Sequence, residues 1–214
     1  MNYHMSPKEY FGKVIELYHS SRKPKFYNPR IKRGRSSSIS SDLEDLTAFF
    51  LALNIHRECT LYTDQPMRFE GYKLKYPDIV IQEKNDEIAH LVDVKTDLGW
   101  KRDGIFDFCL KWEDIISDVK GTKTNFKIGE TKENKEGHFT NSLKYHIVVI
   151  SKENSGKNIN SHIERVKEEK FKNVRLYFLS ESPHPNEYGK PISGILEKLK
   201  IYESEFKRLF ANLG

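Results

Sequence analysis

The segment from Tyr76 to Asp97, YPDIVIQEKNDEIAHLVDVKTD, constrains the fold of this chain more than any other stretch. Its two halves carry the apolar, mostly β-branched runs Ile79-Val80-Ile81 and Leu91-Val92, and such runs are typical of strands. Between them lies the polar cluster Lys84-Asn85-Asp86-Glu87, which indicates a tight turn. The segment therefore predicts an antiparallel β-hairpin.

Two aspartates near the far ends of this hairpin are predicted to face each other. If the turn is centred on Asn85-Asp86 and its loop has an even number of residues, Asp78 lies directly opposite Asp93. Opposed side chains of a hairpin lie about 4.5–5.5 Å apart at Cβ, and like charges at that distance destabilise the pair. A divalent cation between the carboxylates would remove the repulsion, and Mg²⁺ prefers such hard oxygen ligands.

Lys95 adds a positive charge to the same patch. Side chains alternate along a strand, so Lys95 shares a face with Asp93, whereas Val94 points to the other face. Beside a bound cation, the Lys95 amine can orient or deprotonate a water molecule, or offset the charge of a phosphate. Two carboxylates and one amine are therefore expected to converge on one site.

These residues carry a resemblance to a known family. Pro77-Asp78, followed by Asp93-Val94-Lys95, resembles the core motif of the PD-(D/E)xK nucleases, the restriction-endonuclease-like superfamily. The resemblance extends from the helix before residue 55 to the strand near residue 150. It implies an α/β fold with a central mixed β-sheet flanked by helices.

The resemblance also implies an activity. The expected protein is an endonuclease that depends on Mg²⁺, with Mn²⁺ able to substitute, and that hydrolyses phosphodiester bonds of double-stranded DNA, as a type II restriction enzyme does. Asp78 and Asp93 would bind the metal, Lys95 would be the catalytic lysine, and the backbone carbonyl of Val94 would be a further ligand. A symmetric cut would require a homodimer.

Glu44 has two interpretations. It follows Ser41 by three residues, which is a capping-box spacing at the start of the helix predicted over 42–54. In that case Glu44 caps its own helix. It also resembles the acidic residue that the nuclease family carries on the helix before the hairpin, and that resemblance implies a third catalytic carboxylate and metal ligand.

Basic residues outside the hairpin are candidate DNA contacts. The stretch 22–35, RKPKFYNPRIKRGR, contains seven Lys and Arg and no acid, and two prolines prevent a regular helix. It belongs to a predicted basic loop or arm over residues 22–41, in which Lys32, Arg33 and Arg35 would lie along a phosphate backbone. The alternative is a solvated connector. Lys101 and Arg102, just after the hairpin, are candidates for clamping the scissile phosphate.

The rest of the chain alternates helical and strand patterns. Apolar residues at helical spacing predict helices, β-branched runs predict strands, and a lysine-rich segment with glycines predicts a flexible loop. The helices are expected over 7–19, 42–54, 106–120, 159–171 and 193–213, the strands over 57–70, 72–81, 144–151 and 174–179, and the loop over 121–140.

Composition sets the remaining expectations. The 214 residues carry 36 Lys and Arg against 31 Asp and Glu, a formal net charge of +5, which is compatible with a polyanionic partner. Cys59 and Cys109 form neither a zinc-ligand pair nor a disulfide framework, which suits a reducing cytoplasm. No signal peptide, membrane span, P-loop or dinucleotide glycine pattern is seen, so a single cytoplasmic domain over 1–214, without a membrane or a small-molecule cofactor, is expected.

Two other functions remain open from the sequence. A structure-specific repair or recombination nuclease would keep the fold and the site but act on branched or single-stranded DNA. A non-catalytic DNA-binding protein with a degenerate nuclease fold would bind DNA without metal-dependent turnover. The recognised DNA sequence and the position of the cut cannot be read from the residues.

Overall fold

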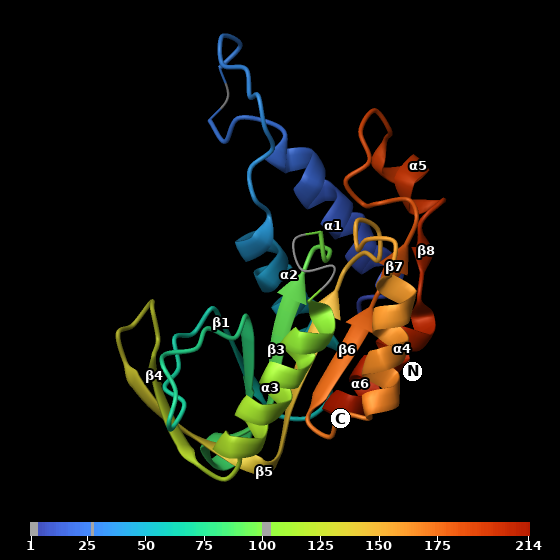
Figure 1. Ribbon diagram of the computed structural model, residues 1–214. Helices are drawn as coiled ribbons and strands as arrows, with labels where there is room; N and C mark the ends of the chain where they lie inside the picture. The colour runs from blue at the N-terminus through green and yellow to red at the C-terminus, as the bar shows by residue number, and fades with distance from the viewer. Residues whose placement is uncertain (1–3, 27, 100–103) are drawn as a thin grey trace.

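The computed structural model describes residues 4–26, 28–99 and 104–214. It is an α/β structure in which helices flank a mixed central sheet (Figure 1). The helices are α1 (Pro7–Ser21), α2 (Ser40–Asn54), α3 (Ile105–Val119), α4 (Ile159–Glu169), α5 (Ile192–Leu196) and α6 (Glu203–Leu213), with a 3₁₀ turn η1 (Lys84–Asp86). The strands are β1 (Thr60–Thr63), β2 (Ile79–Gln82), β3 (Glu87–Lys95), β4 (Lys123–Lys127), β5 (Asn134–Val149), β6 (Val174–Phe178), β7 (Ser180–Glu181) and β8 (Lys200–Ile201).

The central sheet combines an antiparallel and a parallel half. Its strands run in the order β1-β2-β3-β5-β4, and β6 pairs with the last part of β5. Strands β1, β2 and β3 are antiparallel neighbours, whereas β3, β5 and β6 run parallel. Helix α4 connects β5 to β6, as the predicted strand-helix-strand pattern requires. Strands β7 and β8 form a separate antiparallel pair.

Alternating residues of the hairpin serve two cores, one on each face of the sheet. Ile79, Ile81, Val92 and Val94 pack with helices α1, α2 and α6 on one face. Val80, Leu91 and their neighbours pack with α3 and α4 on the other face. Because both faces are covered, the strands read as nearly continuous apolar runs. Asp78, Asp93 and Lys95, at the polar ends of β2 and β3, belong to neither hydrophobic core.

The hairpin has the predicted register at its far end, but through a different turn. Ile79 pairs with Val92 and Ile81 pairs with His90, which is the register that sets Asp78 opposite Asp93. The loop, however, has three residues, because the backbone N–H of Glu83 donates to the carbonyl of Glu87 across η1. A β-bulge adds one residue to β3 between Ile88 and His90 and restores the register.

The prediction of a flexible loop over 121–140 is wrong as secondary structure. Strand β4 and the first part of β5 form an antiparallel hairpin there, with Thr124 pairing with Gly137. Alternate residues of β4 are buried, namely Thr124 and Phe126. Lys123, Asn125 and Lys127 alternate with these buried residues and are exposed, so the strand has a period of two that the lysine-rich composition obscured.

Most predicted helices are confirmed to within two residues, but the last one is wrong. Segment 193–213 forms α5, the short strand β8 and α6 instead of one helix. Helix α5 ends at Leu196, and Lys200 and Ile201 pair with β7 before α6 begins. Ser6 caps α1 through a capping box with Glu9. None of the helices in the described residues combines the length and apolarity needed to cross a membrane.

Candidate active site

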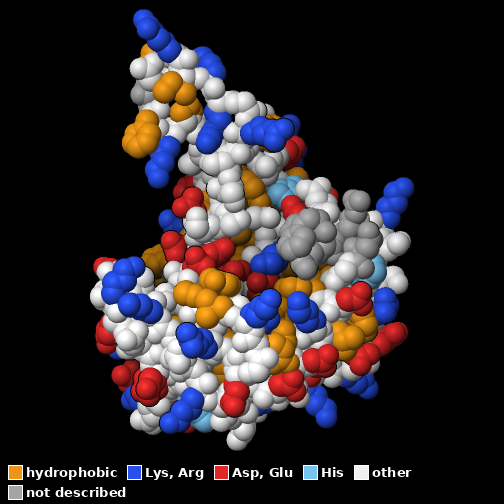
Figure 2. Space-filling view, turned by 60° about the vertical axis from the view of Figure 1, so that its left-hand side comes forward, with side chains coloured by type: hydrophobic (Ala, Val, Ile, Leu, Met, Phe, Trp, Pro, Cys, Tyr) orange, Lys and Arg blue, Asp and Glu red, His pale blue; other side chains and the backbone are white. Residues whose placement is uncertain are grey.

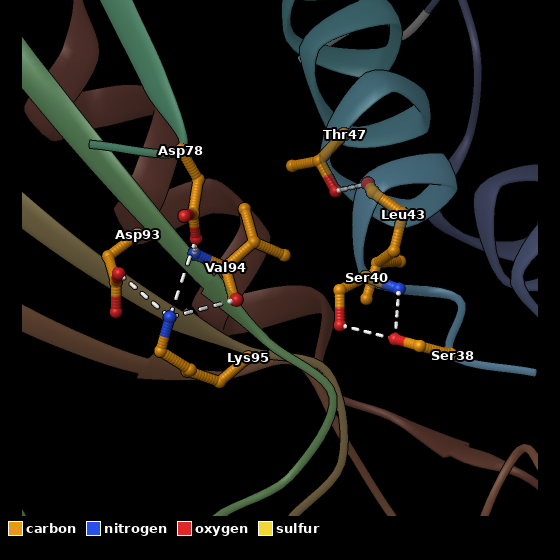
Figure 3. A network of polar contacts seen from close by, with 8 residues as sticks. All are labelled: Ser38, Ser40, Leu43, Thr47, Asp78, Asp93, Val94 and Lys95. Carbon is orange, nitrogen blue, oxygen red and sulfur yellow. Dashed lines mark hydrogen bonds and ion pairs between the residues drawn. The ribbon is translucent and has the colours of Figure 1, made fainter. Parts of the chain in front are cut away.

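The two aspartates lie together at the open end of the hairpin (Figure 3). Asp78 directly precedes β2, and Asp93 lies in β3 one position beyond the partner of Ile79. The Oδ2 atom of Asp78 accepts a hydrogen bond of 2.6 Å from the backbone N–H of Val94. The exposed fraction of the side chain is 16% for Asp78 and 8% for Asp93, so both carboxylates are largely withdrawn from water.

Lys95 bridges the two carboxylates. Its Nζ atom lies 2.8 Å from Asp93 Oδ1 and 3.4 Å from Asp78 Oδ2, and it also donates to the carbonyl of Val94 at 3.3 Å (Figure 3). The repulsion between the two aspartates is therefore offset by an ammonium group of the chain itself. The predicted convergence of Asp78, Asp93 and Lys95 on one site is confirmed.

The protonation states follow from burial and charge. Burial, together with the charge of Asp93, raises the pKa of Asp78 to about 6. Burial lowers the pKa of Lys95, but the charges of Asp93 and Asp78 outweigh it, so the pKa of Lys95 is raised above its ordinary value. Lys95 is thus a charged ammonium at neutral pH. In this arrangement it can offset negative charge but cannot accept a proton.

Glu44 lies on α2 near the same carboxylates and does not cap its helix. The helix begins at Ser40, two residues earlier than predicted, and no side chain caps it. Ser41 is therefore already helical, which removes the capping-box interpretation. Burial raises the pKa of Glu44 to about 7, and the charges of Asp78 and Asp64 add to this rise.

Asp64 is an acidic neighbour that sequence reasoning missed. It directly follows β1, and its backbone N–H donates to the carbonyl of Asp78 at 2.9 Å. Its φ of 47° lies in the left-handed region that residues other than glycine seldom adopt. Its position depends on the pairing of Thr63 with Ile79, and the irregular, proline-containing segment between β1 and β2 did not reveal that register.

The oxygen atoms around Asp93 suit a hard divalent cation. Asp93 Oδ2 is buried, and the hydroxyl of Tyr145 lies close to the Asp93 carboxylate. Burial raises the pKa of Tyr145, and the charge of Asp93 and a hydrogen bond to it raise that pKa further. The two carboxylates and the carbonyl of Val94 provide oxygen ligands of the kind that bind Mg²⁺ together with water molecules and phosphate oxygens. Within the residues described, however, no group of three or more His, Cys, Asp and Glu side chains is arranged to hold a metal ion.

The basic arm projects away from the sheet. Between α1 and α2, the described residues form neither helix nor strand, and Lys32, Arg33 and Arg35 are exposed. Figure 2 shows basic side chains on the end of this projection and acidic side chains gathered below it on the same face. The base of the arm is held by Arg22, whose guanidinium contacts Asn186 and the ring of Tyr188. Lys101 and Arg102, the other predicted phosphate contacts, lie outside the described residues.

Three comparisons with known proteins found no match for this chain. No family model matches the chain, and neither the curated proteins nor the solved structures contain a match. The geometry of the site and the topology of the sheet are the observations that bear on the function of this protein.

Proposed function

We propose that this protein is a metal-dependent endonuclease acting on double-stranded DNA. The observation that carries the proposal is the cluster of Asp78, Asp93 and Lys95 at the open end of one hairpin, with Glu44 on the adjacent helix. A structural role alone does not require two largely buried carboxylates beside one another, because a buried ion pair contributes little net stability.

The order of the elements supports the same proposal. Along the chain come helix α2, the antiparallel strands β1 to β3, helix α3, strand β4 and then β5, which runs parallel to β3. A restriction-endonuclease-like core is expected to have an acidic helix before the hairpin and a parallel strand after it. The positions of Glu44 on α2 and of the two aspartates on the hairpin are compatible with that expectation and support the proposal.

Each residue has a role in the proposed reaction. Asp78, Asp93 and the carbonyl of Val94 would hold Mg²⁺, and Glu44 would complete the acidic set. When bound, Mg²⁺ polarises the phosphate and lowers the pKa of a bound water molecule. The hydrogen bond from Val94 fixes the Asp78 carboxylate in place. Lys95, held as an ammonium, offsets the negative charge that develops on the phosphate.

The exposed arm supports DNA as the substrate. Lys32, Arg33 and Arg35 give an exposed surface of positive charge, which would bind phosphates without reading the sequence. A type II restriction enzyme working as a homodimer is the preferred role, and a repair or recombination nuclease is the alternative. Cleavage of plasmid DNA into discrete fragments supports restriction, whereas cleavage of only branched or single-stranded DNA supports the alternative.

One observation favours a non-catalytic DNA-binding protein instead. The ammonium of Lys95 already offsets part of the charge of the two aspartates, so the chain brings them together without requiring a metal. The Lys95→Ala variant separates the two functions. If the protein is a nuclease, this variant loses cleavage and keeps DNA affinity, whereas Lys152→Ala, which removes another largely buried, ion-paired lysine, keeps both. Full cleavage by Lys95→Ala would refute the assignment.

A further inference from the structure

The ammonium group of Lys95 is enclosed by three oxygen atoms. They belong to Asp93 at 2.8 Å, to the carbonyl of Val94 at 3.3 Å and to Asp78 at 3.4 Å (Figure 3). These are the same residues that the proposed function gives to the metal. Lys95 thus has a cation-binding position of its own, made of the oxygens that a divalent ion needs.

Building on the proposed function, we infer that Lys95 holds the cation position while the site is without metal and leaves it when a divalent cation binds. A divalent ion that used these three oxygens together would have to lie where the Nζ atom of Lys95 lies, and two positive charges that close would repel each other. The affinity for metal is therefore set by a competition within the chain. Lys95 is both a residue of the site and its internal competitor.

The burial of the site explains why such a placeholder is useful. The exposed fractions of the side chains of Asp93, Asp78 and Lys95 are 8%, 16% and 23%, so water compensates their charges poorly. Without Lys95, two carboxylates would face each other across β2 and β3. The ammonium offsets part of this repulsion, and the side chain of Lys95 would still be available to offset charge on a phosphate after a metal displaced it.

Competition by Lys95 and support by Lys95 predict opposite effects of its removal on the affinity for metal. If Lys95 helped to hold the metal, removing it would weaken binding. If it competes, removing its charge frees Asp93 Oδ1 and Asp78 Oδ2 and strengthens binding. The hydrogen bond that must otherwise be broken joins two charged groups, so the expected gain in affinity is at least about tenfold.

The test measures the binding of Mn²⁺ alone, without DNA, from the electron paramagnetic resonance signal of the free ion. Lys95→Met removes the charge and keeps much of the side-chain volume, and Lys95→Gln is a second neutral variant in case the first does not fold. Lys95→Arg keeps a positive charge at the site. Lys152→Met removes a lysine that is 18% exposed and is paired with Glu181 instead of Asp78 or Asp93.

The inference predicts that Lys95→Met and Lys95→Gln bind Mn²⁺ at least about tenfold more tightly than the wild type. Lys95→Arg and Lys152→Met should stay close to the wild type or bind more weakly. Folded neutral variants that bind no more tightly than the wild type would overturn the inference and leave the nuclease proposal standing. If no variant and no wild-type protein binds Mn²⁺, the proposed metal site fails as well.

Discussion

The carboxyl groups of Asp78 and Glu44 share one electrostatic property, which is that the folded chain favours their protonated forms. Burial, with the charges of neighbouring acids, raises the pKa of Asp78 to about 6 and that of Glu44 to about 7. In the unfolded chain both groups titrate near pH 4. Between these values the folded state binds more protons than the unfolded state, so these groups reduce stability as the pH rises through about 6 to 7.

This property predicts a pH-dependent effect of metal. A divalent cation needs both carboxylates ionised, so Mg²⁺ should raise the melting temperature little at about pH 5 and much more at about pH 8. Melting curves in EDTA and in Mg²⁺ across this range measure the effect. Glu44→Gln should reduce the gain at the upper end, whereas an exposed change such as Glu16→Gln should not. A gain independent of pH would contradict these protonation states.

Site residues could be predicted from the sequence when they belong to the same hairpin, and less well when they lie on distant segments. Asp78, Asp93 and Lys95 belong to one hairpin, so alternation and one assumed turn were enough to bring them together. The role of Glu44 was left open, because the start of α2 decided it and the spacing from Ser41 suggested a cap. Asp64 was missed because its place depends on a register set across a long irregular segment.

The hairpin shows that a correct register can follow from an incorrect turn. The three-residue loop and the bulge between Ile88 and His90 change the register by one residue each, in opposite senses. Burial of Ile79, Ile81, Val92 and Val94 in one core requires this register, because a slip by one residue would turn every side chain to the other face. The apolar pattern therefore determined the pairing, and the turn adapted to it.

The neighbouring strands β3 and β5 contain a buried histidine pair that should make stability depend on pH. His90 Nδ1 lies 3.1 Å from His146 Nε2, and His146 Nδ1 lies 3.1 Å from the hydroxyl of Tyr177. Burial lowers the pKa of His90 to about 4 and that of His146 well below its ordinary value. The unfolded chain then binds more protons, so stability present above about pH 6.5 is lost as the pH falls.

For His90 alone the expected loss is on the order of 2 kcal/mol between about pH 7 and about pH 5. Urea unfolding at both values, compared between the wild type and His90→Gln, isolates this part from the opposite contribution of Asp78 and Glu44. The variant should lose less stability on acidification. His138→Gln, at an exposed position of β5, is the control and should behave as the wild type does. Equal losses in wild type and His90→Gln would contradict the buried, neutral pair.

The basic arm between α1 and α2 should supply DNA affinity that depends on salt. Replacing Lys32, Arg33 and Arg35 by glutamine should weaken binding and reduce the slope of log affinity against log salt by up to about three, because each lost phosphate contact contributes about 0.9. Titration of labelled duplex DNA at several salt concentrations measures the slope. The control replaces Lys167, Lys170 and Lys207, which are exposed on and beside α4 and α6. An unchanged slope in the arm variant would assign the arm to a solvated connector.

At the scale of the whole molecule, the candidate site lies at the end of the mixed sheet where β2 begins and β3 ends. Helix α2 brings Glu44 to this edge, and the projecting arm lies above it (Figure 1). The β2–β3 hairpin, the crossover through α4 and the mixed character of the sheet could be predicted, because they follow from clear apolar periods. The β4–β5 hairpin and the break before α6 could not, because lysines masked one pattern and a helical apolar spacing continued through the other.

We expect the carboxylates of Asp78 and Asp93 to support metal-dependent cleavage of DNA. Incubation of the purified protein with phage DNA, with and without Mg²⁺, beside Asp93→Asn tests this expectation most directly. The wild type should cleave only in the presence of Mg²⁺ or Mn²⁺, and Asp93→Asn should not cleave. Equal cleavage by wild type and variant, or no cleavage of duplex, branched or single-stranded DNA by a folded, metal-supplied wild type, would contradict it.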